Sequence, residues 1–125
     1  SGDAIHDMIR FVRAPVTTVG SGWVASAGAH IFLAPPKERR LCLPNTRFMI
    51  HQPAGGAGGQ ASDIAIQAKE ILRTRERIAR VIATQTGRPY ETVVTDMERD
   101  FWMSASEAIE YGIVSRIVER QSQLG

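Results

Sequence analysis

The sequence predicts an α/β domain, because short β-type runs alternate along the chain with segments of helical periodicity. The strand candidates are only three to six residues long, and Gly and Pro separate many of the elements. With 125 residues, of which 43% are hydrophobic and 22% charged, the chain has the size and composition of one compact globular domain. Strands that alternate with helices are typical of βαβ-type units. We therefore expect residues 1–125 to form a single domain, with neither internal repeats nor a linker.

The first half of the chain is expected to begin with an amphipathic helix, because positions 4, 5, 8, 9 and 12 are apolar. Pro15 closes this helix. Strands are then expected at Val16–Val19, Leu41–Leu43 and Arg47–His51, and a helix of small residues at about 25–34. In the third strand Phe48 and Ile50 alternate with polar or flexible side chains, which predicts one buried face.

Residues 61–86 form the longest periodic segment, with apolar or small side chains recurring at spacings of three and four. At 1.5 Å per residue this helix spans about 39 Å. Because that is long for a domain of this size, we expect part of the helix to project or to pack on a partner.

Gly87 ends the long helix, and Pro89 begins the next, over about 89–98. Residues 99–103 are a short connection or a strand. Ser104 and Glu107 have the spacing of a capping box, which predicts a helix that runs to Tyr111 and stops at Gly112. A last strand is expected at Ile113–Val118.

Charge and hydropathy exclude several classes of protein. A net charge of +2 with scattered arginines is too weak for a nucleic-acid surface. No apolar run reaches membrane-spanning length, and no signal peptide is visible, so we expect a cytosolic or organelle-matrix protein. The single cysteine, Cys42, leaves no partner for an internal disulfide and is expected to be a buried, inert thiol. Because a helix opens the chain with nothing before it to pack on, we expect residues upstream of Ser1 to be missing.

Ser26 is the first candidate for chemistry, because it lies among small residues in Ala25–Ala29. A β-type run and the Gly20–Gly22 turn precede it. A strand, a tight turn and a helix start together present a nucleophile, and the free N–H groups at the helix start stabilise negative charge. The alternative is a tightly packed helix of small residues with one incidental serine.

His51 is the best candidate for a base among the three histidines, because it ends a strand beside a glycine-rich segment. His30 lies four residues after Ser26 on the same helix, which leaves no room for a substrate between them. The pattern does not choose among the acids that could orient the base, which include Asp3, Asp7, Asp63, Asp96 and Asp100. Asp100 is a suggestive candidate for the orienting acid, because it lies between Arg99 and two aromatic residues. The alternative is a local Arg–Asp pair on the surface.

The glycine-rich segment 52–60 admits three interpretations. A phosphate-binding loop is one, although neither a Gly-Lys-Ser/Thr sequence nor the dinucleotide-binding spacing is present. A flexible linker is the second. The third is an extended edge that pairs with the backbone of another chain, since glycine permits close approach.

Five motifs together resemble the proteolytic subunits of the Clp protease family. They are Ala25–Ala29, Leu41–Pro53, Gly58–Ile64, Glu98–Ala105 and Glu107–Val114, and the match covers nearly all of residues 1–118. The resemblance implies a crotonase-like (ClpP-type) fold of repeated ββα and βαβ units. It makes about 52–86 a handle region that includes the long helix, and it implies that the N-terminal strands of the family fold are missing from this chain.

The resemblance also implies a role for particular residues. Ser26 matches the nucleophile, His51 the base, Asp100 the orienting acid, and Ala27 a backbone oxyanion donor at a position where the family usually has methionine. The second oxyanion donor would lie upstream of Ser1. Further matched positions are Gly55, Gly56, Ala57 and Gly58 for substrate binding, Gln60 and Arg99 for the oligomer interface, and Phe11, Val19, Leu41 and Leu43 for docking a partner ATPase. For these last four, ordinary core packing remains the alternative.

The function that the resemblance implies is hydrolysis of unfolded proteins inside two stacked heptameric rings of this subunit. An AAA+ unfoldase, such as a ClpX- or ClpA-type ATPase, would deliver the substrates and use the ATP. This chain would need neither cofactor nor metal, would bind neither nucleic acid nor membrane, and would act in the bacterial cytosol or an organelle matrix. Alternatives are a non-catalytic ring subunit, an acyl-CoA enzyme of the same superfamily, and a capsid-maturation or signal-peptide peptidase relative.

Overall fold

The computed structural model describes residues 2–25, 27–51 and 61–124, without the side chains of residues 61–64. The strands within these residues form two three-stranded sheets. The first sheet has the order β1-β3-β6 and is parallel. The second has the order β2-β4-β5, with β2 and β4 parallel and β5 antiparallel to β4. The strands are β1 (Thr18–Gly20), β2 (Trp23–Ala25), β3 (Arg40–Cys42), β4 (Arg47–Ile50), β5 (Phe101–Ser104) and β6 (Arg116–Ile117).

Each of the first two ββα units contributes one strand to each sheet. The chain crosses from β1 to β2 through Gly20–Gly22, where Gly22 has the positive φ of 67° that favours glycine. Gly20 lies so close to β4 that an added Cβ would stand 3.1 Å from the Phe48 ring. This close approach brings the second sheet against the end of the first.

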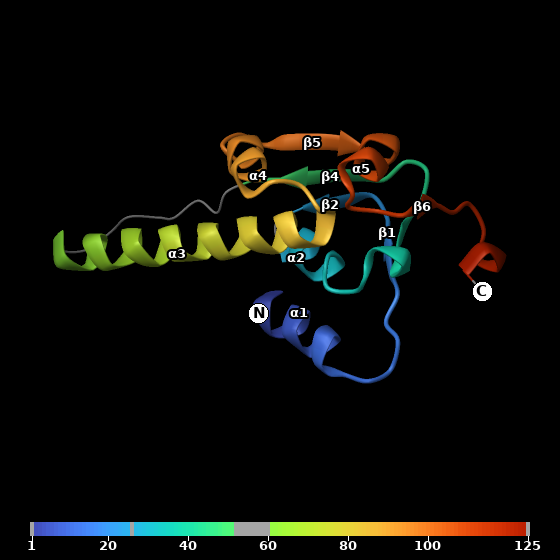
Figure 1. Ribbon diagram of the computed structural model, residues 1–125, viewed down its shortest axis with the longest axis horizontal. Helices are drawn as coiled ribbons and strands as arrows, with labels where there is room; N and C mark the ends of the chain where they lie inside the picture. Colours follow the sequence, from blue (N-terminus) through green and yellow to red (C-terminus); the bar gives the residue numbers. More distant parts are fainter. Residues whose placement is uncertain (1, 26, 52–60, 125) are drawn as a thin grey trace.

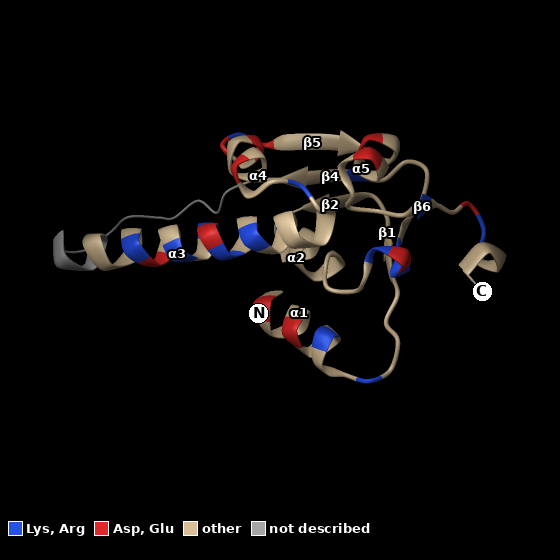
Figure 2. Cartoon of the chain, in the orientation of Figure 1, with Lys and Arg blue, Asp and Glu red and all other residues tan. Residues whose placement is uncertain are grey.

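Five α-helices and two short 3₁₀ turns in the described residues complete the fold (Figure 1). They are α1 (Gly2–Phe11), α2 (Ala27–Phe32), η1 (Lys37–Arg39), α3 (Ala61–Thr86), α4 (Tyr90–Met97), α5 (Ala105–Tyr111) and η2 (Gln121–Leu124). The first part of α3 extends beyond the sheets, which confirms that the long helix projects (Figure 1). Acidic and basic residues recur along the described part of α3 (Figure 2). No helix in the described ranges combines the length and apolarity needed to cross a membrane.

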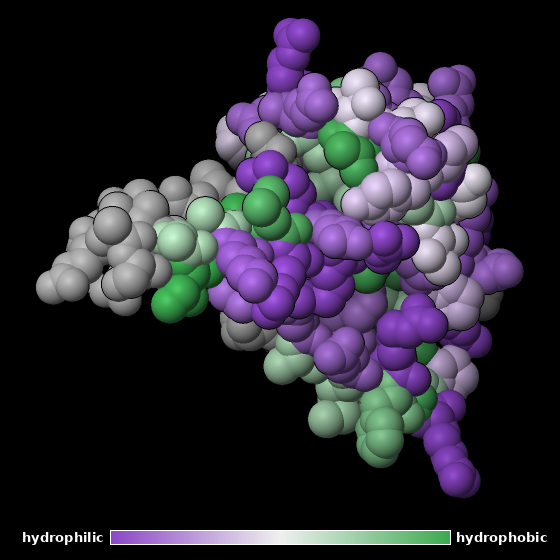
Figure 3. All heavy atoms as spheres, turned by 60° about the vertical axis from the view of Figure 1, so that its left-hand side comes forward, coloured by the Kyte–Doolittle hydropathy of each residue, from purple (hydrophilic) through white to green (hydrophobic). Residues whose placement is uncertain are grey.

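The core lies between the second sheet and the helices that cover it. Phe48 and Ile50 of β4 are 1% and 3% exposed, and they belong to one core cluster with Phe32 of α2, the following Leu33 and Ile82 of α3. The alternation predicted for this strand is therefore confirmed. Hydrophobic side chains also reach the surface on the projecting part of α3 and at the bottom of the view, where α1 lies (Figure 3).

Cys42 is free and fully buried, as predicted. Burial raises the pKa of its thiol, because the thiolate would be desolvated. A thiol that is buried and protonated is a poor nucleophile, which agrees with an inert role.

Arg40 is the least expected member of the interior, since it is 0% exposed. Its guanidinium donates to the carbonyl oxygens of Ile113 (2.7 Å), Pro35 (2.8 Å), Gln85 (2.8 Å) and Gly112 (2.9 Å). One side chain of β3 thereby joins the end of α3 to the segment between α5 and β6. Burial lowers the pKa of Arg40 to about 10, so the side chain stays protonated at neutral pH.

Several element boundaries differ from the sequence prediction. The strand β2 was not predicted, and the helix expected from residue 25 begins at Ala27. The strands expected at 16–19 and 113–118 form only at Thr18–Gly20 and Arg116–Ile117. These strands are two or three residues long and are fixed by pairing with distant strands, which a local pattern does not show.

The predictions for the last helix are confirmed in detail. The Ser104 hydroxyl accepts from the Glu107 N–H (3.2 Å), and the Glu107 carboxylate accepts from the Ser104 N–H (2.9 Å), which is a complete capping box. Gly112 ends the helix in the left-handed conformation, with φ of 101°. The stretch left open as connection or strand is the strand β5.

Candidate active site

One end of the second sheet gathers the predicted site residues that the structure describes. In the antiparallel pair, Ile50, the last residue of β4, lies opposite Phe101, the first residue of β5. His51 directly follows Ile50, and Asp100 directly precedes Phe101, so both residues lie next to the last pair of this ladder. The structure thus brings a half-buried histidine and an exposed aspartate, 49 residues apart in sequence, to the same end of the ladder.

The strand β2 ends at the same place. Because β2 and β4 are parallel and Ala25 pairs with Met49, the carboxyl ends of both strands lie at the same edge of the sheet. The helix α2 begins two residues later at Ala27, and Ser26 itself lies outside the described residues. In α/β sheets, ligands bind beyond the carboxyl ends of the strands. Sheet topology therefore brings Ala27, His51 and Asp100 to one edge.

The start of α1 lies against the start of α2. A Cβ added to Gly2 would stand 3.1 Å from the Cβ of Ala27, so only the small residue permits this approach. A cavity of about 230 Å³ opens next to this contact, and both Ala27 and His51 border it. The candidate site thus has an adjoining space of its own.

The structure separates the acids that the sequence left as alternatives. Asp96 accepts a hydrogen bond from the Tyr111 hydroxyl (2.7 Å). Burial raises the pKa of Tyr111, and the hydrogen bond to Asp96 raises it further. Asp3 pairs with Arg77 and His30. Asp7 is exposed on α1, and the Asp63 side chain is not described. Asp100 directly precedes Phe101, whose partner Ile50 directly precedes His51.

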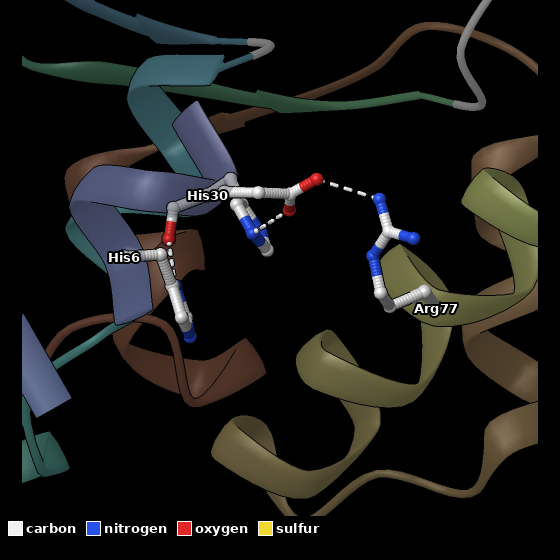
Figure 4. A network of polar contacts seen from close by, with 4 residues as sticks. His6, His30 and Arg77 are labelled. Atoms are coloured by element: carbon white, nitrogen blue, oxygen red, sulfur yellow. Dashed lines mark hydrogen bonds and ion pairs between the residues drawn. The ribbon is translucent and has the colours of Figure 1, made fainter. Parts of the chain in front are cut away.

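His30 takes part in a different network from the one its spacing suggested. Its Nε2 donates to Asp3 (2.8 Å), and its backbone carbonyl accepts from His6 Nδ1 (2.7 Å) (Figure 4). The two imidazole rings stack with centroids 4.3 Å apart. Sequence reasoning missed this network, because residues 3, 30 and 77 come from three helices and no local spacing links them.

Three of the predicted docking residues lie in or beside the first sheet. Val19 of β1 pairs with Leu41 of β3, and Leu43 directly follows β3. Val19 is 41% and Leu43 37% exposed, whereas Leu41 is 2% exposed. Phe11, at the end of α1, is 81% exposed.

The remaining predictions concern residues for assembly and for substrate binding. Arg99 is exposed between α4 and β5, directly before Asp100. Gly55, Gly56, Ala57, Gly58 and Gln60 lie outside the described residues.

Comparison with solved structures identifies the fold. The structure superposes on a mutant of ClpP1 from Listeria monocytogenes with a TM-score of 0.91 and 56% sequence identity, covering 99% of this chain and 68% of that one. The α/β fold of two linked sheets and a projecting helix is therefore that of a ClpP subunit, as the resemblance implied.

The family model described as Clp protease matches residues 1–121, so this chain belongs to the Clp protease family. It is 58% identical over 124 residues to the ATP-dependent Clp protease proteolytic subunit 3 of Rhizobium johnstonii, and 57% identical over 126 residues to subunit 2 of Gluconobacter oxydans. The chain spans 64% and 56% of the length of these two relatives.

Proposed function

We propose that this chain carries the catalytic groups of a serine endopeptidase that cleaves unfolded proteins inside a ring complex. The observation that carries the proposal is the pairing of β4 with β5, because His51 and Asp100 both adjoin the last pair of this ladder, at the end of the sheet where β2 ends and α2 begins. Ser26 is the residue between that strand and that helix in sequence. Membership of the Clp protease family supports a protease.

In the proposed reaction, Ser26 Oγ attacks the carbonyl carbon of the peptide bond while His51 removes the hydroxyl proton. His51 then delivers this proton to the leaving amine, and water hydrolyses the acyl-enzyme by the same route. Asp100 holds the imidazole in the required tautomer and stabilises its cation. The chemistry uses side chains and peptide N–H groups only.

Ala27 is the proposed backbone donor to the oxyanion. Its N–H belongs to the first turn of α2, where helix N–H groups have no partner within the helix and the helix dipole favours negative charge. A backbone donor does not depend on its own side chain, so alanine serves as well as methionine. One such donor contributes about a hundredfold or more to the rate.

The partners are part of the proposal. Two stacked heptameric rings would enclose the sites, and an AAA+ unfoldase of the ClpX or ClpA type would deliver unfolded chains. Arg99 and Gln60 would contact neighbouring subunits, and residues 55–58 would bind the substrate backbone. The relatives are named as proteolytic subunits of an ATP-dependent protease, which supports a partner that uses ATP. The proposed place of action is the bacterial cytosol.

Hydrolysis of a fluorogenic peptide by the full-length protein tests the proposal. Ser26→Ala and His51→Ala should each lower kcat by at least about a thousandfold, since the pair acts as a unit. Asp100→Asn should lower kcat strongly with little change in KM. The matched control is Ser21→Ala, an exposed serine in the preceding turn, which should retain full activity. Undiminished hydrolysis by Ser26→Ala would refute the proposal.

A further inference from the structure

The helix α2, which carries the proposed oxyanion donor, is too short to fix its own position. It has six residues, and helices shorter than about 12 residues are only marginally stable in water on their own. Contacts with other elements therefore set its orientation. Because a catalytic group must lie within about 0.5 Å of its productive position, these contacts also affect how well the N–H of Ala27 can stabilise the oxyanion.

Side chains from two other elements bind the carboxyl-terminal end of α2. His6 of α1 donates from Nδ1 to the carbonyl oxygen of His30 (2.7 Å), and Thr18 of β1 donates to the carbonyl oxygen of Phe32 (3.0 Å). The last carbonyl groups of a helix have no partner within the helix, so these bonds satisfy them from outside. One end of α2 is thus held by α1 and β1.

His30 also ties α2 to α3 through one carboxylate. His30 Nε2 donates to Asp3 Oδ1 (2.8 Å), and Arg77 of α3 donates to Asp3 Oδ2 (2.6 Å) (Figure 4). Hydrogen bonds to an ionised acceptor are stronger than bonds between neutral groups, and the His30 side chain is only 9% exposed, so water weakens its bond little. The carboxylate of Asp3 therefore joins α1, α2 and α3.

The protonation of His30 explains the direction of its bond. Burial lowers the pKa of His30, and the stacked His6 lowers it further against the opposing effect of Asp3. A neutral imidazole has one N–H, which the contact with Asp3 places on Nε2. The other nitrogen, Nδ1, is buried and has no partner among the described residues, which lowers stability. The bond to Asp3 therefore accounts for a histidine here better than packing does, since phenylalanine would avoid that loss.

This network lies next to the proposed oxyanion donor. Gly2, the neighbour of Asp3 in α1, is so close to Ala27 that an added Cβ would stand 3.1 Å from the Ala27 Cβ. His30 follows Ala27 by three residues, which places both on the same side of α2. Ala27, His30 and Asp3 accordingly border one cavity. A shift of His30 away from Asp3 would therefore move the first turn of α2.

We propose that Asp3 is a positioning residue for hydrolysis, which, bonded to His30 and Arg77, fixes α2 against α3 and so holds the N–H of Ala27 in place for the oxyanion. This inference rests on the proposed function. In this role Asp3 acts through α2 and touches neither the substrate nor the reacting atoms. Removal of an oxyanion donor lowers kcat by about a hundredfold or more, so a donor that is displaced but still present should lower it about tenfold.

Inhibition of the full-length protein by a peptide boronic acid tests this role. The boron atom bonds to the serine hydroxyl, and one oxygen of the tetrahedral adduct occupies the position of the oxyanion. Asp3→Ala should lower kcat about tenfold, leave KM within twofold, and raise Ki of the boronic acid by about the same tenfold. Ki does not depend on the fraction of folded enzyme, so a merely structural role would lower kcat and leave Ki unchanged.

Asp3→Asn keeps an acceptor for His30 and loses the charge. Its Ki should lie between the values of the wild type and Asp3→Ala, and it gives a second measurable variant if Asp3→Ala fails to fold. Arg77→Gln should also raise Ki. Its effect should not add to that of Asp3→Ala, because both substitutions break the same link between α2 and α3.

Two matched controls lie on the same helices. Asp7 is exposed on α1, and Arg73, one turn before Arg77, pairs with Glu70 (3.2 Å). Asp7→Ala and Arg73→Gln should each leave Ki unchanged. A Ki for Asp3→Ala within twofold of the wild-type value would overturn the inference while leaving the proposed peptidase intact. Failure of the wild-type protein to cleave a fluorogenic peptide would overturn both.

Discussion

Replacing Arg40 should destabilise the protein more than any change at a neighbouring surface arginine. Arg40→Met removes the donor from four carbonyl oxygens, three of them in buried bonds. A buried acceptor left without its partner costs about 1–3 kcal/mol. Methionine carries no charge that must be desolvated on folding, and its apolar side chain packs well in the interior. Both effects offset part of this cost. We therefore expect Arg40→Met to lower the free energy of unfolding by about 3–6 kcal/mol.

Arg40→Lys distinguishes the effect of the positive charge from that of the arrangement of hydrogen-bond donors. Lysine keeps a positive charge but donates from one nitrogen, so it cannot reach carbonyls that belong to Pro35, Gln85 and the 112–113 segment at once. Its effect should lie between those of wild type and Arg40→Met. Because lysine retains a charge and some donors, it also gives a measurable variant if Arg40→Met fails to fold.

The assay is the thermal midpoint of the full-length protein at one fixed protein concentration, since the stability of an oligomer depends on concentration. In a protein of 150–250 residues, 1 kcal/mol shifts Tm by about 2–4 °C. Arg40→Met should therefore lower Tm by about 6–24 °C. The control is Arg39→Met, because Arg39 makes one exposed bond to Thr17 (3.2 Å) and should shift Tm by about 2 °C at most. An equal effect of the two substitutions would refute the reasoning.

Three further predictions concern stability. Burial lowers the pKa of His30 in the folded protein, so below about pH 6.5 the unfolded chain binds a proton more readily and the wild type loses stability. Between pH 7.5 and 5.5 the Tm of His30→Phe should therefore fall less than that of the wild type, and equal falls would contradict this. At Gly112, φ is 101° and an added Cβ would stand 2.6 Å from the Thr86 carbonyl oxygen, so Gly112→Ala should lower the free energy of unfolding in urea by at least about 2 kcal/mol. Gly87 has φ of 76° but open space around it, so Gly87→Ala should lower it by about 1 kcal/mol. Ser104→Ala removes one half of the capping box and should cost about 1 kcal/mol, with no loss if the cap is unimportant.

Local rules predicted the elements whose signals are local. The capping box at Ser104, the stop at Gly112 and the alternation around Phe48 depend on neighbours within a few residues, and all three are confirmed. The strand β2 has only three residues, of which Trp23 is 76% exposed, so it lacks the alternation and length that identify a strand. Its pairing with β4, 24 positions away, determines it.

The candidate site was predictable only in part for the same reason. Residue pattern proposed His51 because it ends a strand. Pattern alone left five aspartates and several glutamates open, and the resemblance had to choose Asp100. The pairing of β4 with β5, which ends next to both His51 and Asp100, supports that choice. The link between Asp3, His30 and Arg77 and the burial of Arg40 depend on tertiary contacts between distant helices and strands, which no sequence spacing encodes.

The identity of the nucleophile is the central claim, and covalent labelling tests it most directly. Full-length protein is incubated with a fluorophosphonate probe, digested, and the modified peptide is located by mass spectrometry. The proposal predicts one labelled residue, Ser26, with labelling abolished in Ser26→Ala, strongly slowed in His51→Ala and unchanged in Ser21→Ala. Labelling at another serine, or none in the assembled wild-type protein, would contradict the proposed catalytic role.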